Sequence, residues 1–195
     1  MQGVTMAFFE DVWSRNFLNI FASPLLISEY VAGLVLSSIL TSIIGLAAML
    51  LIAILIFKLS FLVYGLMVIP FLLVLFLFGI AFGIIGSGLV LRFGPASEWF
   101  IWPIPALVTP FVGVLYTVSI LPEWMRVISR FLPPSYVFEQ LRVIVSGGRA
   151  SGIALIWSAC LAVVYIMAAY RVFVRIYRHA LRTGLIARYS AENVG

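Results

Sequence analysis

Long apolar runs separated by short polar breaks dominate this chain. The runs over residues 28–57, 61–91 and 151–174 carry few charged side chains, and each has the roughly 20 residues that an α-helix needs to cross a bilayer. A fourth run, residues 99–120, is as apolar but contains several prolines. The pattern predicts an all-α integral membrane protein with about four transmembrane segments, forming a single domain over residues 1–195.

The fourth run is not expected to be a simple span. Pro103, Pro105 and Pro110 interrupt it, and a proline in a helix interior removes an amide donor and breaks the helix. In lipid, a broken backbone is tolerated only where protein or a water-filled cavity covers it. We therefore expect this run to enter the membrane and to fold partly back near one face, as a re-entrant segment.

Residues 121–146, which follow this run, have the pattern of interfacial helices. Charged residues recur three positions apart, as Glu123 with Arg126 and Glu139 with Arg142, a spacing at which helical side chains can pair. The stretch is too short and too charged to cross the membrane. We expect Pro133-Pro134 to divide it into two helices, with the pair Glu139–Arg142 holding the re-entrant segment at the outer interface.

The N-terminal region contains another amphipathic stretch. Residues 1–9 are apolar but too short to span a bilayer. Residues 10–27 place six side chains near one stripe at helical spacing, and Ser23-Pro24 should end the helix. An interfacial helix is the simpler interpretation, and a docking helix for a cytoplasmic partner is the alternative. The stripe consists of Val12, Trp13, Asn16, Phe17, Ile20 and Phe21.

Composition supports a membrane location. Hydrophobic residues make up 64% of the chain and charged residues only 10%, whereas soluble domains have about 25% charged residues. The net charge of +5 does not indicate nucleic-acid binding, because much of it trails the last apolar run. That arrangement predicts a cytoplasmic basic tail over residues 175–195, and with four crossings a cytoplasmic N-terminal helix as well. The trailing residues are Arg171, Arg175, Arg178, His179, Arg182 and Arg188.

Small residues mark two expected packing ridges. In the first span they recur every four residues, and in the second they include a GxxxG pattern, which allows helices to approach closely. Cys160, the only cysteine, is expected to be a buried filler within an apolar helix. The ridges are Gly33, Ser37, Thr41 and Gly45 in the first span, and Gly79, Gly83, Gly86 and Gly88 in the second.

The chain lacks the residues that catalysis would need. Lys58 is the only lysine and no GxxxxGK[ST] motif is present, so the chain has no P-loop for ATP phosphates. His179 is the only histidine and lies among arginines, and no serine has a histidine to activate it. We expect no enzyme activity, no metal site and no cofactor site in this chain.

Two stretches together resemble a known family, the integral membrane subunits of type-2 ABC exporters, which move polysaccharides, lipids and drugs. The stretch over residues 8–33 is similar to the family's cytoplasmic coupling segment, in which an amphipathic helix is followed by Ser-Pro, a Glu and a Gly that opens the next span. Here these are Ser23, Pro24, Glu29 and Gly33. The stretch over residues 110–142 resembles the family's C-terminal motif: P-x-x-G-x-x-[FY], then LP-x-W, then LP and a closing Glu-x-x-Arg. Its residues are Pro110, Gly113, Tyr116, Leu121, Pro122, Trp124, Leu132, Pro133, Glu139 and Arg142.

The resemblance implies an export function in the bacterial inner membrane, with the C-terminus in the cytoplasm. Two permease chains, identical or different, would pair across a pathway, and separate ABC ATPase subunits would bind ATP and dock on the coupling helix. Family members have six spans, so this chain would carry the last four and the end of the second. The implied ATPase-docking residues are Glu10, Asp11, Trp13, Arg15 and Phe17. The implied outer gate and re-entrant residues are Glu98, Trp99, Trp102, Pro110, Gly113, Tyr116, Pro122, Trp124, Pro133, Glu139 and Arg142.

Alternatives remain open. The absent spans fit a truncated, non-transporting structural or regulatory membrane protein derived from this family, and a membrane enzyme is a third class. Glu98 can be either a solvated interfacial carboxylate or a gating residue. The resemblance implies that Trp99, Trp102 and Tyr116 line the pathway, where they would suit an amphipathic or glycan substrate.

Overall fold

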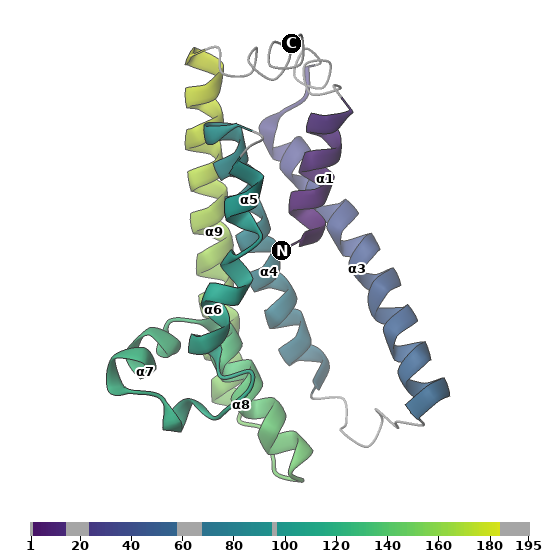
Figure 1. The fold of residues 1–195 in the computed structure, drawn as a ribbon, viewed down its shortest axis with the longest axis vertical. Coiled ribbons are helices and arrows are strands. Elements are labelled where there is room, and N and C mark those ends of the chain that lie inside the picture. Colours follow the sequence, from purple (N-terminus) through teal and green to yellow (C-terminus); the bar gives the residue numbers. More distant parts are fainter. Residues whose placement is uncertain (1, 15–23, 58–67, 95–96, 184–195) are drawn as a thin grey trace. The chain divides into compact units, whose positions relative to one another are not determined.

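The structure, a computed structural model, is built of helices (Figure 1). It describes residues 2–14, 24–57, 68–94 and 97–183, and within these ranges no strand is present. Three helices are long and apolar enough to cross a membrane, which confirms the all-α membrane class. They are α3 (Ile27–Phe57), α4 (Val68–Phe93) and α9 (Gly152–Thr183).

The last long helix extends further than the sequence pattern predicted. The span was expected to end at residue 174 and to be followed by a basic tail, but α9 continues as one helix to Thr183. The arginines expected in the tail are good helix formers, and no proline or glycine interrupts them before Thr183. Arg175, Arg178, His179 and Arg182 of the predicted tail therefore belong to the end of the helix. Residues 184–195, with Arg188, lie outside the described residues.

The fourth expected membrane segment, residues 99–120, is not one helix. It is divided into α5 (Glu98–Ile101), α6 (Ile104–Val112) and the 3-10 helix η3 (Val118–Ile120). Pro103 stands at the N-cap of α6, where a proline is tolerated, and Gly113 ends α6 in the left-handed conformation at φ +70°. Pro103 marks one break, as expected, but Pro105 and Pro110 lie inside α6, so the prediction that they interrupt the helix was wrong. Pro105 is in the first turn, where the amide has no partner within the helix. None of the pieces is long enough to span a bilayer.

The N-terminal helix is placed differently from the prediction. α1 runs continuously over Gln2–Trp13, so no helix begins at residue 10, and residues 24–26 are not helical. No helix-breaking residue separates the apolar stretch from the expected amphipathic one, which explains why α1 crosses that boundary. The rest of the predicted 10–27 helix, residues 15–23, lies outside the described residues.

The chain divides into two compact units. Unit 1 contains Met1–Leu51, Gly79–Ile101 and Met167–Gly195, and unit 2 contains Ile52–Phe78 and Trp102–Ile166. In unit 1 two of the four predicted glycines of α4, Gly86 and Gly88, lie close to neighbouring helices. A Cβ atom added to Gly86 would lie 3.4 Å from Thr5 of α1, and one on Gly88 would lie 3.4 Å from Ile176 of α9. These glycines permit the close approach of neighbouring helices.

The other predicted ridge, on α3, is not covered by the described part of the chain. Its four small residues, Gly33, Ser37, Thr41 and Gly45, are all exposed, and no atom lies within 4 Å of a Cβ added at Gly33 or Gly45. The neighbouring Ser38 is buried instead and meets Gly3 of α1. Cys160 is exposed on α9, so the prediction of a buried filler was wrong for this chain.

Unit 2 has its own apolar core and a set of short helices. The helices α7 (Glu123–Arg130) and α8 (Pro133–Val145) confirm the predicted division, and they pack against each other and against α6 (Figure 1). The Gln140 carboxamide accepts a hydrogen bond from the amide of Ser151 at 2.7 Å, which fixes α8 to the start of α9. The buried core consists of Phe71, Val74, Val137 and Ala162.

Candidate functional site

Two side chains on α8 hold the loop between α6 and η3. One carboxylate oxygen of Glu139 accepts hydrogen bonds from the Val118 amide at 2.7 Å and from Arg142 Nη1 at 3.0 Å. The other terminal nitrogen of Arg142 donates to the carbonyl of Gly113 and, at 3.1 Å, to that of Val114. We call these five residues, Gly113, Val114, Val118, Glu139 and Arg142, the α8 clamp.

Local sequence explains how the α8 clamp forms. Glu139 and Arg142 lie three residues apart, so both side chains project from one face of α8. Gly113 adopts φ +70°, and a Cβ there would lie 2.9 Å from a Val118 methyl group and 3.1 Å from the Tyr116 carbonyl oxygen. A glycine is therefore required both by the backbone conformation and by the space available. Its turn directs the loop back toward α8.

The charges of the α8 clamp balance each other and are partly exposed. The side chains of Glu139 and Arg142 retain about a third of their accessible surface. An ion pair with that exposure contributes little by itself, but hydrogen bonds from charged groups to backbone contribute more, about 1.5–3 kcal/mol each when well shielded. The clamp is therefore chiefly a device that fixes the backbone of the loop, which sequence spacing alone could not show.

The other residues of the C-terminal motif also contact one another. The Tyr116 hydroxyl donates to the Pro110 carbonyl at 2.8 Å. The Trp124 ring packs edge-on against Phe111, with ring centroids 6.1 Å apart. Pro122 stands at the N-cap of α7, and Pro133 is the first residue of α8. The motif residues from Pro110 to Arg142 thus belong to one local structure within unit 2.

The second predicted charge pair does not form. Arg126 donates through Nε to the Leu121 carbonyl at 3.0 Å, and the ion pair recorded among the described residues is Glu139–Arg142. Arg126 lies one turn after the start of α7, where the chain enters from Leu121-Pro122, so the Leu121 carbonyl is close by. This local backbone acceptor competes successfully with Glu123.

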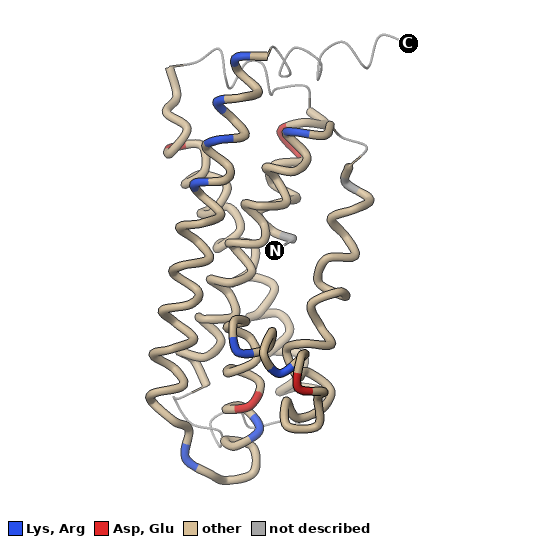
Figure 2. Tube along the Cα trace, turned by 90° about the vertical axis from the view of Figure 1, so that its left-hand side faces the viewer, with Lys and Arg blue, Asp and Glu red and all other residues tan. Residues whose placement is uncertain are grey.

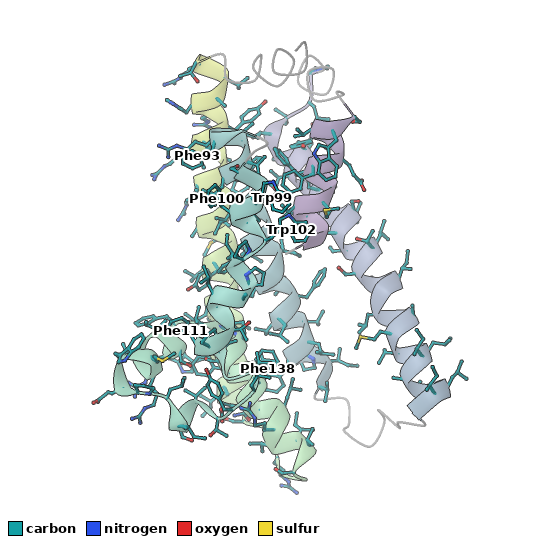
Figure 3. The ribbon with its side chains drawn as sticks, viewed as in Figure 1. Phe93, Trp99, Phe100, Trp102, Phe111 and Phe138 are labelled. Carbon is teal, nitrogen blue, oxygen red and sulfur yellow. The ribbon has the colours of Figure 1, made fainter. Side chains whose placement is uncertain are left out.

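The aromatic residues expected at the outer gate are exposed. Trp99 lies on α5 with 81% of its surface accessible, and Phe100 beside it is 80% exposed (Figure 3). Trp102 lies between α5 and α6, at the start of the second segment of unit 2, and is 44% exposed. Glu98 is the first residue of α5, and its side chain is not among those described. Exposed tryptophans of this kind suit a membrane–water interface or an amphipathic ligand.

A shallow apolar groove adjoins the α8 clamp. It has a volume of about 320 Å³, and the Arg142 side chain lies at its edge. Because Arg142 is already engaged by Glu139 and two carbonyls, the groove offers apolar contact more than a free charge. Its lining consists of Val114, Phe138, Leu141, Arg142, Val145 and Ser146.

The predicted ATPase-docking residues are described only in part. Glu10, Asp11 and Trp13 lie in the last turn of α1, whereas Arg15 and Phe17 fall outside the described residues. Trp13 is 53% exposed and stacks on Phe9, with ring centroids 5.4 Å apart and planes 10° from parallel. The stack covers one face of the indole, while about half of the Trp13 surface is accessible.

Asp11 joins α1 to the start of α3. Its carboxylate accepts a hydrogen bond of 2.9 Å from the Tyr30 hydroxyl. Burial raises the pKa of the Asp11 carboxyl, the Tyr30 hydrogen bond opposes that rise, and the charge of Glu10 adds to it. Glu29 caps the N-terminus of α3 by accepting from the Leu26 amide at 2.9 Å. These acidic groups line a hollow of about 400 Å³ between α1 and α3.

Several groups at these sites could not have been identified from the sequence. Tyr30 carries no charge and belongs to no motif, and its bond to Asp11 bridges 19 positions of the chain. The carbonyls of Gly113 and Val114 and the amide of Val118 are backbone groups, whose partners depend on the folded loop. Within the described ranges no cluster of histidine, cysteine or carboxylate side chains could hold a metal ion.

No protein-family model, no curated protein and no solved structure matches this chain.

Proposed function

We propose that this chain is the membrane-spanning permease subunit of an ATP-driven ABC exporter, and that it docks a separate ATPase subunit. The observation that carries the proposal is the α8 clamp. The two ends of the C-terminal motif, Pro110-x-x-Gly113 and Glu139-x-x-Arg142, bond to each other although they lie more than 25 residues apart. A motif whose parts are joined in this way behaves as one structural element.

The proposed mechanism assigns a coupling role to α1. An ATPase that closes on ATP would press on the exposed last turn of α1, where Trp13 is accessible. Movement of α1 would pass to α3 through the Asp11–Tyr30 hydrogen bond and through the close contact of Gly3 with Ser38. Because α3 is a membrane-length helix, a rigid-body shift at one end reaches the other face of the bilayer.

The broken segment provides the other proposed element. Pro103 and Gly113 divide it into short helices, and the α8 clamp fixes the loop between α6 and η3 to α8. The part of the segment that these hydrogen bonds hold can move together with α8, which suits an outer gate. The aromatic side chains Trp99, Trp102 and Tyr116 would offer stacking surfaces to an amphipathic or glycan substrate.

The proposed assembly is a pair of permease chains in the bacterial inner membrane, with the C-terminus in the cytoplasm. The small-residue ridge of α3 supports pairing, because it is exposed in this chain and would allow a second helix to approach. The basic end of α9 supports the cytoplasmic orientation.

Affinity purification tests this function. The tagged chain is expressed in a bacterial membrane and extracted in mild detergent, and co-purifying proteins are identified by mass spectrometry. The proposal predicts a P-loop ATPase that is retained with wild type, lost with Trp13→Ala, and retained with Trp157→Ala, a tryptophan on α9 that is also more than half exposed. If the ATPase is absent, or is unaffected by Trp13→Ala, the docking assignment is wrong.

A further inference from the structure

Four arginines form a continuous stripe along the end of α9. They occupy positions 171, 175, 178 and 182, so the intervals of four, three and four residues keep them within about 60° of one helix face. All four are exposed, and Figure 2 shows them as a row of blue bands along the last turns of the helix. We call Arg171, Arg175, Arg178 and Arg182 the arginine stripe.

The opposite face of the same turns is packed inside unit 1. Phe173, Tyr177 and Ala180 are buried there, about half a turn around the helix from the arginines. A Cβ on Gly88 of α4 would lie 3.5 Å from Phe173, so α4 covers this side closely. The rotation of α9 is thereby fixed, and the arginine stripe must face away from the unit's core.

Among the residues that the structure describes, no ion pair accounts for the arginine stripe. The ion pair recorded among the described residues, Glu139–Arg142, does not involve it. The negative end of the helix dipole favours cations only in the last turn, which contains Arg182 alone. The three preceding arginines therefore have a regular placement that helix stability does not require.

The position of the arginine stripe along α9 corresponds to a membrane surface. Residues 152–170 carry no charge and extend about 28 Å, close to the roughly 30 Å of a bilayer's hydrocarbon core. Tyr170, an exposed residue of a type enriched at membrane interfaces, ends this stretch. Arg171 then lies at the hydrocarbon edge, Arg175 about 6 Å beyond it and Arg178 about 10 Å beyond it.

The direction of the side chains favours lipid over a soluble partner. Each Cα–Cβ bond in an α-helix tilts toward the helix N-terminus, which for these residues is the membrane side. Long arginine side chains therefore lean back toward the headgroup layer, which is about 5–7 Å deep on each face. Arg171, Arg175 and Arg178 can reach this layer, whereas Arg182 lies about 16 Å beyond the hydrocarbon edge.

We propose that three residues of the arginine stripe, Arg171, Arg175 and Arg178, bind the phosphate groups of anionic phospholipids in the adjoining leaflet. The planar guanidinium group donates two parallel hydrogen bonds to a phosphate, and three such groups along one face can engage neighbouring headgroups. Each basic residue near an anionic surface raises the affinity by about five-fold, equivalent to about 1 kcal/mol. The alternative partner for these arginines is an acidic surface on another protein.

Native mass spectrometry of the full chain tests the proposal. The protein is equilibrated in mixed micelles with equal amounts of phosphatidylglycerol and phosphatidylcholine, and the retained lipids are counted. We expect phosphatidylglycerol to be enriched at least five-fold. Combining Arg171→Gln, Arg175→Gln and Arg178→Gln should reduce that enrichment to near two-fold or less, with the helical circular-dichroism signal unchanged.

Two further variants make the result specific. Replacing the same three arginines by lysine keeps the charge but removes the planar donor pair, so enrichment should fall only in part. Combining Arg130→Gln with Arg149→Gln removes exposed charge in unit 2 and should leave the enrichment at 70% of wild type or more. If wild type shows no enrichment, or if the triple glutamine variant retains it, the lipid proposal is overturned and an acidic protein surface becomes the partner to seek.

Discussion

Glu139 lies 3.0 Å from Arg142 and also accepts the Val118 amide, whereas Arg142 donates to the carbonyls of Gly113 and Val114. Each side chain therefore holds a backbone group of opposite polarity. The pair is directional, because an amide can only donate and a carbonyl can only accept. Its contribution depends on the loop it holds more than on the attraction between the two charges.

This polarity predicts that exchanging the two residues does not restore stability. In a chain with Glu139→Arg and Arg142→Glu, a carboxylate would face two carbonyls and a guanidinium would face an amide hydrogen. We expect Arg142→Ala and Glu139→Ala each to cost about 1–2 kcal/mol, which lowers the melting temperature by about 2–6 °C. The double exchange should be at least as destabilised as either single variant, measured by circular dichroism during heating in detergent.

Two variants control for the α8 clamp. Glu139→Gln keeps an acceptor oxygen for the Val118 amide, so its loss should be smaller than that of Glu139→Ala. Arg149→Ala removes an exposed arginine beyond α8 and should change the melting temperature by less than about 1 °C. Recovery of wild-type stability in the double exchange would mean that the pair acts through charge alone.

A series of glycine variants separates backbone strain from crowding. Gly113→Ala introduces both backbone strain and crowding, because its φ is +70° and the added Cβ would lie 2.9 Å from Val118. Gly147→Ala introduces only backbone strain, because its φ is +82° but no atom lies within 4 Å of the added Cβ. Gly152→Ala introduces neither backbone strain nor crowding. We expect losses of stability in that order, with about 1–2 kcal/mol for Gly147 and more for Gly113. If Gly113→Ala and Gly147→Ala lose the same stability, the Val118 side chain moves aside without cost and crowding contributes nothing.

The Asp11 carboxyl gives a pH-dependent prediction. Its pKa is raised in the folded chain, chiefly by burial, so folding favours the protonated form. The corresponding stability is complete below the unfolded pKa of about 3.9 and is lost as the pH rises through the folded pKa. Asp11→Asn stays neutral and can still accept from Tyr30. Its melting temperature should match wild type near pH 4 and exceed it at pH 7, by no more than about 4 °C.

Tyr30→Phe provides the matched experiment. It removes the hydroxyl that lowers the pKa of Asp11, so the pH range over which wild-type stability falls should extend upward. Glu10→Gln should shift that range downward, because the charge of Glu10 raises the pKa of Asp11. If the melting temperatures of wild type and Asp11→Asn change with pH in parallel, the titration of Asp11 does not contribute to stability.

The sequence predicted the features that depend on local pattern. Hydropathy identified α3, α4 and α9, because a bilayer imposes length and apolarity on any span. Prolines identified where α6 and α8 begin, because their effect on the backbone is local. The spacing of Glu139 and Arg142 predicted their pairing for the same reason.

Features that depend on backbone groups, or on residues far apart in the sequence, could not be predicted from the sequence. The same spacing predicted a Glu123–Arg126 pair, but the carbonyl of Leu121 engages Arg126 instead. The partner of Asp11 is Tyr30, a residue that no local pattern relates to it. The predicted start of the helix at Glu10 was wrong, since α1 begins at Gln2 and includes the apolar residues before Glu10. An amphipathic pattern identifies one face of a helix but does not show where the helix begins.

A photo-crosslinking experiment at position 13 tests the central claim most directly. A benzophenone amino acid replaces Trp13, the exposed residue in the last turn of α1, and the full chain is irradiated in bacterial membranes. The same amino acid at position 157 serves as the control. An ABC exporter permease should give an adduct with a P-loop ATPase from position 13 and none from position 157. Adducts that contain no ATPase, or ATPase adducts of equal yield from both positions, would contradict the account.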